Sequence, residues 1–131
     1  MKLIIQIPCY NEEAALPYFL KEIKQTEADL SASHGCHFEL IFINDGSRDN
    51  TLNVLREFAK EDPSVRYLSF SRNFGKEAAM YAGFCNAKGD YVAALDADMQ
   101  DPPSLLPKMM KIIKEEGYDS AKMFEMVKKA A

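Results

Sequence analysis

The sequence has few cysteines, no long apolar run and no excess of basic residues, and each shortage excludes a class of protein. Its three cysteines are odd in number and widely spaced, so a disulfide framework is not expected. Reduced thiols in a cytoplasmic setting are expected instead. No apolar run reaches the roughly 20 residues of a membrane-spanning helix, and the N-terminus lacks the features of a signal peptide. The formal net charge is −4, with lysine and arginine scattered, so nucleic acid is not an expected partner.

The length of 131 residues suits a single domain with one core, and the chain has no repeat, linker or low-complexity tract. The stretch "HGCH" at 34–37 contains possible metal ligands. It lies in a polar connector without a second pair of ligands elsewhere, which favours a loop over a metal site.

Short apolar runs alternate with helical patterns four times along the chain. This order is typical of an α/β fold, Rossmann-like, with a mostly parallel sheet, helices on both faces and about four βα units. Pro17 belongs in the first turn of the first helix, because a proline deeper inside would break it. Strands are expected at 3–8, 38–44, 65–70 and 90–95, and helices at about 17–33, 51–60, 75–87 and 103–117.

A polar loop follows each predicted strand. Ligands of open parallel sheets bind beyond the carboxyl ends of the strands, where the strand order reverses. Four polar loops at one edge therefore predict a site for a polar ligand. The loops are "PCYNEE" (8–13), "NDGSRDNT" (44–51), "SRNFGK" (71–76) and "DADMQD" (96–101).

The first two loops carry both structural and binding candidates. Tyr10 offers a ring for stacking on a flat group, and Glu12 offers an acceptor for hydroxyls. Asp45 is either part of an Asp-Gly turn or an acceptor for N–H groups of a ligand. Asp49 and Asn50 are assigned to structure, because either can cap the helix that begins near Thr51.

Lys76 lies in the first turn of the third predicted helix, where the helix dipole disfavours a cation. A bound phosphate or diphosphate would remove this conflict, because free backbone N–H groups and the lysine would both point at it. The alternative is a solvated surface lysine whose charge is partly offset by Glu77.

Asp96 and Asp98 are two residues apart at a strand end, so both carboxylates face the same side if the chain stays extended. With Gln100 they form an oxygen-only set that suits Mg²⁺ or Mn²⁺ rather than zinc. An acidic turn without a metal is the alternative, and Asp101 is expected to cap the fourth helix. An EF-hand is excluded, because the twelfth position of the loop is Pro107.

The motifs "IPCYNEE", "INDGSRDNT", "SRNFGKEAAMYAGF", "AKGDYVAALDADMQDPP" and "GYD" together resemble the inverting glycosyltransferases of family 2, which have the GT-A fold. Within that family they are most similar to the branch that loads a sugar onto a polyprenyl phosphate, such as dolichyl-phosphate mannosyltransferases and bactoprenol glucosyltransferases. The resemblance covers residues 3–119. Complete relatives often lie at the cytoplasmic face of a membrane.

This resemblance implies a donor site for a UDP- or GDP-sugar. Pro8, Tyr10 and Glu12 would line the base and ribose pocket, Asp45 would bind the base, and Lys76 would approach the diphosphate.

The Asp-X-Asp element of the family corresponds to Asp96, Ala97 and Asp98. Asp98 and Gln100 would bind the metal, and Asp96 would contact the sugar nucleotide or the metal, which makes Asp96 and Asp98 the candidate catalytic residues. The implied reaction passes a hexose to a lipid phosphate with inversion, assisted by Mg²⁺ or Mn²⁺. A phosphate acceptor is already anionic and needs no strong general base.

The sequence departs from the family pattern after "GYD", where "SAKMFEMVKKAA" follows. A donor-binding domain at 1–119 and a helical tail at 120–131 are therefore expected, with most of the acceptor region absent. Two alternatives stay open. One is a nucleotide-sugar-binding or regulatory fragment without transfer, and the other is a receiver- or flavodoxin-like module. An uncovered sheet flank also predicts a homo-oligomer, which a monodisperse monomer in light scattering would contradict.

Overall fold

The computed structural model describes residues 2–89, 91–98 and 103–108. Four parallel strands form one sheet in the order β3-β2-β1-β4. The strands are β1 (Lys2–Cys9), β2 (His37–Asn44), β3 (Val65–Ser69) and β4 (Tyr91–Ala94). The helices are α1 (Leu16–His34), α2 (Thr51–Glu61), α3 (Lys76–Cys85) and a short 3₁₀ helix, η1 (Pro103–Leu105).

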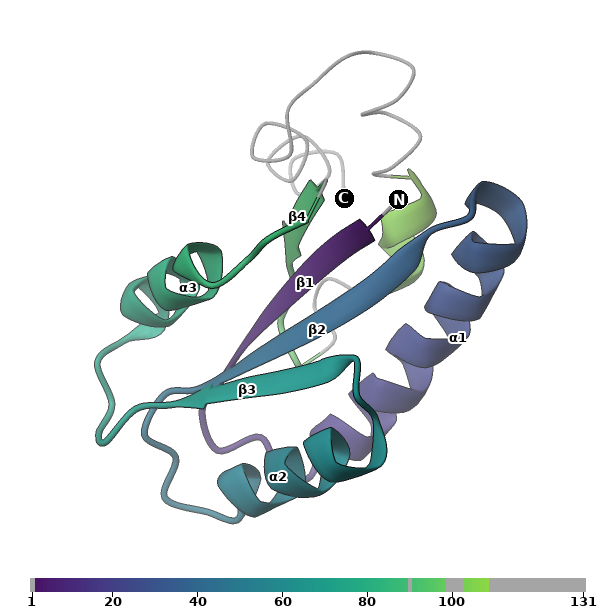
Figure 1. Ribbon diagram of the computed structural model, residues 1–131. Helices are drawn as coiled ribbons and strands as arrows, with labels where there is room; N and C mark the ends of the chain where they lie inside the picture. The colour runs from purple at the N-terminus through teal and green to yellow at the C-terminus, as the bar shows by residue number, and fades with distance from the viewer. Residues whose placement is uncertain (1, 90, 99–102, 109–131) are drawn as a thin grey trace.

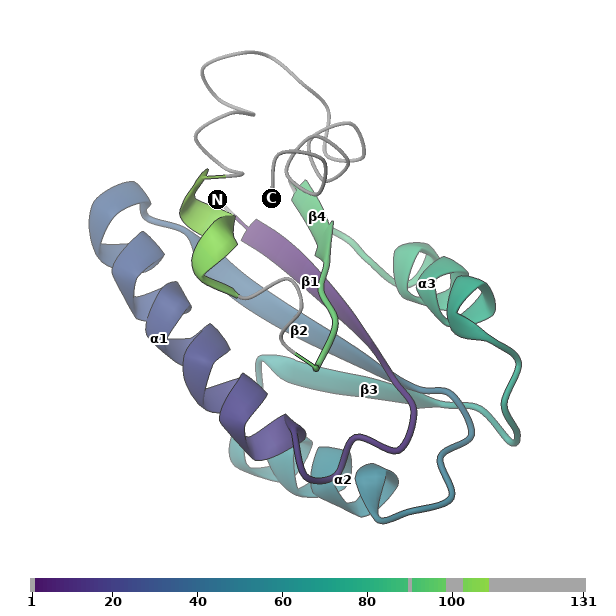
Figure 2. The same ribbon diagram turned by 180° about the vertical axis from the view of Figure 1, so that it is seen from behind.

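Helices cover both faces of the sheet, with α1 and α2 on one face and α3 on the other (Figures 1 and 2). The predicted α/β class with a parallel sheet is confirmed. The strand order changes direction between β1 and β4, since the chain adds β2 and β3 on one side of β1 and then returns to its other side. This reversal marks the edge at which a parallel sheet forms a binding crevice.

Alternate residues of β1 point to opposite faces of the sheet. Leu3, Ile5 and Ile7 join the larger core beneath α1 and α2, where Phe19 packs edge-on against Phe42 at 6.2 Å between ring centroids. A smaller core lies beneath α3. Its buried members are Ile4, Ile41, Ile43 and Ala79.

The predicted elements are found with small shifts of their ends. Pro17 lies in the first turn of α1, as expected, and Gly35 caps the C-terminal end of the helix in a left-handed conformation (φ 63°) that suits glycine. The expected helix at 103–117 begins as η1 and continues through 106–108. Asp101, its expected cap, and the predicted tail at 120–131 lie outside the described residues.

Of the two residues expected to cap α2, only one makes a hydrogen bond to the helix backbone. Asn50 occupies the N-cap position but makes no side-chain capping bond to the helix backbone. Asp49 takes that role, because its carboxylate accepts a hydrogen bond from the backbone N–H of Thr51 at 2.9 Å. The carboxamide oxygen of Asn50 instead accepts a bond from the side chain of Asn53 at 2.6 Å.

Candidate functional site

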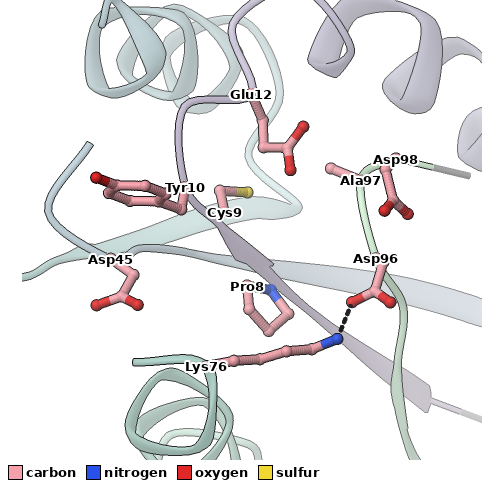
Figure 3. A pocket seen from close by; sticks show the side chains of 9 residues that line it. All are labelled: Pro8, Cys9, Tyr10, Glu12, Asp45, Lys76, Asp96, Ala97 and Asp98. Carbon is pink, nitrogen blue, oxygen red and sulfur yellow. Dashed lines mark ion pairs between the residues drawn. The ribbon is translucent and has the colours of Figure 1, made fainter. Parts of the chain in front are cut away.

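A pocket lies at the carboxyl ends of β1 and β4, where the strand order reverses (Figure 3). All eight substrate-binding candidates of the sequence line it, and Cys9 lines it as well. Gln100, the further metal candidate, lies outside the described residues. The lining residues are Pro8, Cys9, Tyr10, Glu12, Asp45, Lys76, Asp96, Ala97 and Asp98.

The loop after β1 is fixed to the loop after β2 by hydrogen bonds. Asn11 adopts a left-handed conformation (φ 53°), which asparagine tolerates better than most residues. Its side-chain oxygen accepts a bond from the backbone N–H of Arg48 at 2.8 Å, and its own N–H donates to Ser47 Oγ at 3.0 Å. The N–H of Glu12 donates to Thr51 Oγ1 at 2.9 Å. These bonds position Glu12 and Tyr10 at the pocket.

Asp45 connects the pocket to the loop that precedes α3. Its side chain is almost fully buried, and its carboxylate accepts bonds from the backbone N–H groups of Phe74 and Gly75 at 2.8 and 3.1 Å. Asn73 Nδ2 adds a third bond at 3.2 Å. The next residue, Gly46 (φ 66°), lies so close to this loop that an added Cβ would be 2.2 Å from the backbone nitrogen of Asn73. The turn therefore requires glycine, and Asp45 has a structural role whatever it binds.

Lys76 reaches from the first turn of α3 toward the end of β4, and its Nζ lies 2.8 Å from Asp96 Oδ1 (Figure 3). The unfavourable position of a lysine at a helix N-terminus is thus compensated by a carboxylate. The expected partner was a phosphate or solvent, and the pair with Asp96 was missed, because the two residues belong to different elements.

Negative charge dominates the described lining of the pocket. Burial raises the pKa of Glu12, and the nearby charges of Asp98, Asp96 and Asp49 raise it further. Burial also raises the pKa of the Cys9 thiol, followed by the effects of Glu12 and Asp96. Four lining carboxylates face one lysine among the described residues, so a cation would be favoured here. The carboxylates are Glu12, Asp45, Asp96 and Asp98.

The donor set fits a hard cation that is bound only partly by protein. Within residues 2–89, 91–98 and 103–108, no group of three or more His, Cys, Asp or Glu side chains is arranged to hold a metal ion. Asp96 and Asp98 supply carboxylate oxygens at the pocket, and Ala97 between them is buried in the core. Two carboxylates suit Mg²⁺ or Mn²⁺, which complete their shells with water and ligand phosphates. They do not suit a closed zinc site.

Comparison with known proteins shows which family this chain resembles. The description "Glycosyl transferase family 2" matches residues 4–127. A prophage bactoprenol glucosyl transferase homolog of Escherichia coli K12 is 41% identical over 111 residues, which are 85% of this chain and 35% of that protein. An undecaprenyl-phosphate 4-deoxy-4-formamido-L-arabinose transferase of Shewanella sediminis is 44% identical over 117 residues, or 88% of this chain and 34% of that protein. The chain thus spans about a third of the length of these relatives.

Solved structures share the fold. The mannosyltransferase PcManGT of Pyrobaculum calidifontis, solved with GDP-Man and Mn²⁺, has a TM-score of 0.68 and 21% identity over 85% of this chain and 32% of that one. TarS of S. aureus (residues 1–349) has a TM-score of 0.67 and 22% identity over 88% of this chain and 33% of that one.

Proposed function

Because this chain belongs to glycosyl transferase family 2, we propose that its pocket binds a UDP- or GDP-sugar with a divalent cation for inverting transfer of a hexose to a polyprenyl phosphate. The main support for this proposal is that all four strand-end loops line one acidic pocket, which also contains a lysine. The names of the relatives support a polyprenyl phosphate as acceptor.

The pocket has two ends that would receive different parts of the donor. Tyr10 and Asp45 lie at one end, and Asp96 and Asp98 lie at the other, with Lys76 between them (Figure 3). Tyr10 is 43% exposed, so its ring is available for stacking on a base. Asp45 already accepts three hydrogen bonds and has room for about one more, which would limit it to a single contact with the base.

At the other end, Asp96 and Asp98 would hold the cation, with Lys76 beside it. When bound, Mg²⁺ or Mn²⁺ would supply Lewis-acid stabilisation of the charge that develops on the departing diphosphate. Asp96 would exchange its ammonium partner for the cation, and Lys76 would turn toward a phosphate oxygen. Glu12 would accept hydrogen bonds from sugar or ribose hydroxyls.

The pocket is open and has a volume of about 180 Å³. Pockets that enclose most of a small ligand typically measure roughly 300–1,000 Å³. A nucleotide sugar would therefore extend beyond the described walls, and its sugar would face an acceptor arriving from outside. Binding of a nucleotide sugar without transfer is the alternative that we keep, since the chain corresponds to about a third of each relative.

We also propose a cytoplasmic location for this chain. Among the described residues, no helix combines the length and apolar character that crossing a bilayer requires. Cys9, Cys36 and Cys85, all within the described part of the chain, form no disulfide with one another, which supports a reducing, cytoplasmic compartment.

Calorimetric titration tests this function. UDP, GDP and their glucose and mannose derivatives are added to the chain with and without Mn²⁺. We expect one nucleotide to bind, with Mn²⁺ tightening its Kd at least about tenfold through the shared diphosphate. Asp98→Asn should remove the Mn²⁺ effect, while Glu57→Gln on the exposed side of α2 should not. Absence of binding by every nucleotide, with or without Mn²⁺, contradicts the proposal. Release of UDP or GDP in the presence of a polyprenyl phosphate separates transfer from binding alone.

A further inference from the structure

Exposed aromatic side chains gather on α3 and the loop that leads into it. Phe74, Tyr81 and Phe84, which we call the α3 aromatic surface, are 51%, 72% and 49% exposed. Among the described residues, the other large exposed apolar side chains are Tyr10, which lines the pocket, and Tyr18, which lies on α1. Single exposed aromatics are ordinary on protein surfaces, but Tyr81 and Phe84 are three residues apart on α3 and therefore neighbours on one face of it, with Phe74 in the preceding loop.

The packing of α3 explains why its large side chains face outward. The helix contacts the sheet through Ala79 and Gly83, both buried, and the Gln6 side chain occupies the space beside Gly83. Small inward residues bring the helix close to the sheet and leave the bulky residues outside. The charged residues of α3 are Lys76 and Glu77, both in its first turn, so 78–85 is uncharged although much of it is exposed. A helix that is apolar on all sides is normally covered.

Basic residues border the α3 aromatic surface. The Arg72 guanidinium lies 4.7 Å from the centre of the Phe74 ring, and Lys88 follows the helix three residues after its end. Arg66 donates to the backbone oxygen of Asn86 at 3.1 Å, although Glu39 also pairs with it. Residues 66–89 contain four basic residues and one acidic residue, in a chain whose net charge is −4. Arg66 and Lys76 already pair with Glu39 and Asp96, so the attraction to an anionic partner would come from Arg72 and Lys88.

The surface also adjoins the pocket. The N–H of Phe74 donates to the Asp45 carboxylate, and Lys76 lines the pocket from the first turn of α3. A partner held by α3 would therefore lie next to the site. Tyr81 and Phe84 are exposed on α3, and Phe74 is exposed in the loop before it. Exposed aromatic side chains on a helix suit insertion between lipid headgroups.

We propose that the α3 aromatic surface docks this domain onto the surface of an anionic lipid bilayer, with Phe74, Tyr81 and Phe84 among the headgroups and Arg72 and Lys88 on their charges. Aromatic rings with flanking cations are the combination that binds such interfaces. This inference rests on the proposed function, because a lipid-phosphate acceptor would then reach the pocket from the bilayer on which the domain lies.

Co-sedimentation with vesicles tests the proposal. The chain is mixed with vesicles of phosphatidylcholine alone or of phosphatidylcholine with phosphatidylglycerol. We expect binding to the anionic vesicles, lowered about tenfold in Tyr81→Ser/Phe84→Ser through lost apolar contact and about tenfold in Arg72→Gln/Lys88→Gln through lost charge. Tyr18→Ser, which removes an aromatic of similar exposure from α1, should bind like the unchanged chain. Circular dichroism establishes that each variant is folded.

The docking proposal would be overturned if the folded chain did not bind anionic vesicles, or if the α3 variants bound them as well as the unchanged chain. Binding of single-stranded RNA but not of vesicles would also overturn it. So would a dimer of the chain that Tyr81→Ser/Phe84→Ser dissociates while vesicle binding is unchanged. Nucleotide titration is independent of this surface. A chain that binds anionic vesicles but no nucleotide would therefore contradict the proposed function alone. A chain that binds a nucleotide but no vesicles would contradict the docking alone.

Discussion

At the scale of single residues, Asp45 illustrates how one side chain serves fold and site together. From the sequence alone, Asp45 could be either a turn residue or a hydrogen-bond acceptor for a ligand. In the structure its carboxylate accepts backbone N–H groups of Phe74 and Gly75, which are about 30 positions later in the chain. Such partners cannot be inferred from local sequence, because they depend on how α3 is placed over the sheet. The ligand role of Asp45 stays a prediction.

Cys9 was missed as a lining residue, although it lies between two residues that were proposed for the pocket. It is the last residue of β1, and its side chain is 2% exposed and packs in the larger core. Its thiol donates a hydrogen bond to the Ile7 carbonyl oxygen at 3.3 Å. The sequence signal was its place between Pro8 and Tyr10, but the alternation of a strand predicts an inward side chain there.

The three thiols should differ in reactivity. Cys85 is exposed, whereas Cys9 and Cys36 are buried, and burial together with the charges of Glu12 and Asp96 raises the pKa of the Cys9 thiol. We expect a disulfide reagent at mildly alkaline pH to modify one thiol in the native chain and three after denaturation. Cys85→Ser should abolish the native reaction. Labelling of Cys9 as fast as Cys85 would contradict the burial of the Cys9 side chain.

At the scale of elements, the strands were predictable to within about one residue, because buried apolar runs are short and bounded by polar loops. The length of α3 was overestimated at both ends, since 75–87 is uniformly rich in small and apolar residues and carries no stop signal. The Lys76–Asp96 pair was not predictable, because it joins the start of one element to the end of another. The meeting of the loops was predictable, because parallel strands end at one edge.

The close approach of α3 to the sheet depends on Gly83. A Cβ at this position would lie 2.1 Å from Gln6 Oε1 and 2.8 Å from its Cδ, and the Gln6 side chain is fully buried. Gly83→Ala should therefore lower the free energy of unfolding by about 1–3 kcal/mol through overpacking, despite the higher helix propensity of alanine. Urea denaturation measures the change.

A second substitution tests the cause of this effect. In the Gln6→Ala background, Gly83→Ala should cost little or should stabilise, because the overlapping amide is gone. An equal loss in both backgrounds would show that Gln6 is not the obstacle.

At the scale of the whole molecule, ion pairs fasten separate parts of the fold. Glu39 on β2 pairs with Lys2 of β1 at 2.7 Å and with Arg66 of β3 at 2.6 Å. Lys24 of α1 pairs with Asp62, at the end of α2, at 2.6 Å. Burial alone would raise the pKa of Glu39 and of Asp62, but these partners hold both pKa values below their usual 4.5 and 3.8.

A carboxyl group whose pKa is lower in the folded chain contributes stability that is present above its unfolded pKa and is lost as pH falls through its folded pKa. The free energy of unfolding should therefore decline below about pH 4.5, first through Glu39 and then through Asp62. Lys24→Met should flatten the part of this decline that belongs to Asp62, whereas Lys21→Met on the same helix should not. Urea midpoints between pH 6 and pH 3 give the comparison, and identical profiles for both variants would contradict the assignment.

The order of the strands in the sheet could not be predicted from the sequence, because alternating strands and helices are compatible with several strand orders of a parallel sheet. The order β3-β2-β1-β4 places the reversal beside Asp96 and Asp98, so the densest group of carboxylates meets Tyr10, Glu12 and Lys76. The receiver- and flavodoxin-like alternative is excluded by the family match over residues 4–127.

We propose that this pocket holds a diphosphate and a divalent cation between the loops after β1 and β4. A crystal structure of the chain with Mn²⁺ and UDP or GDP would show both ligands. We expect anomalous density for manganese between the diphosphate and the carboxylates of Asp96 and Asp98, with Lys76 turned from Asp96 to a phosphate oxygen. A pocket without nucleotide or manganese, in which Lys76 still pairs with Asp96, would contradict the claim.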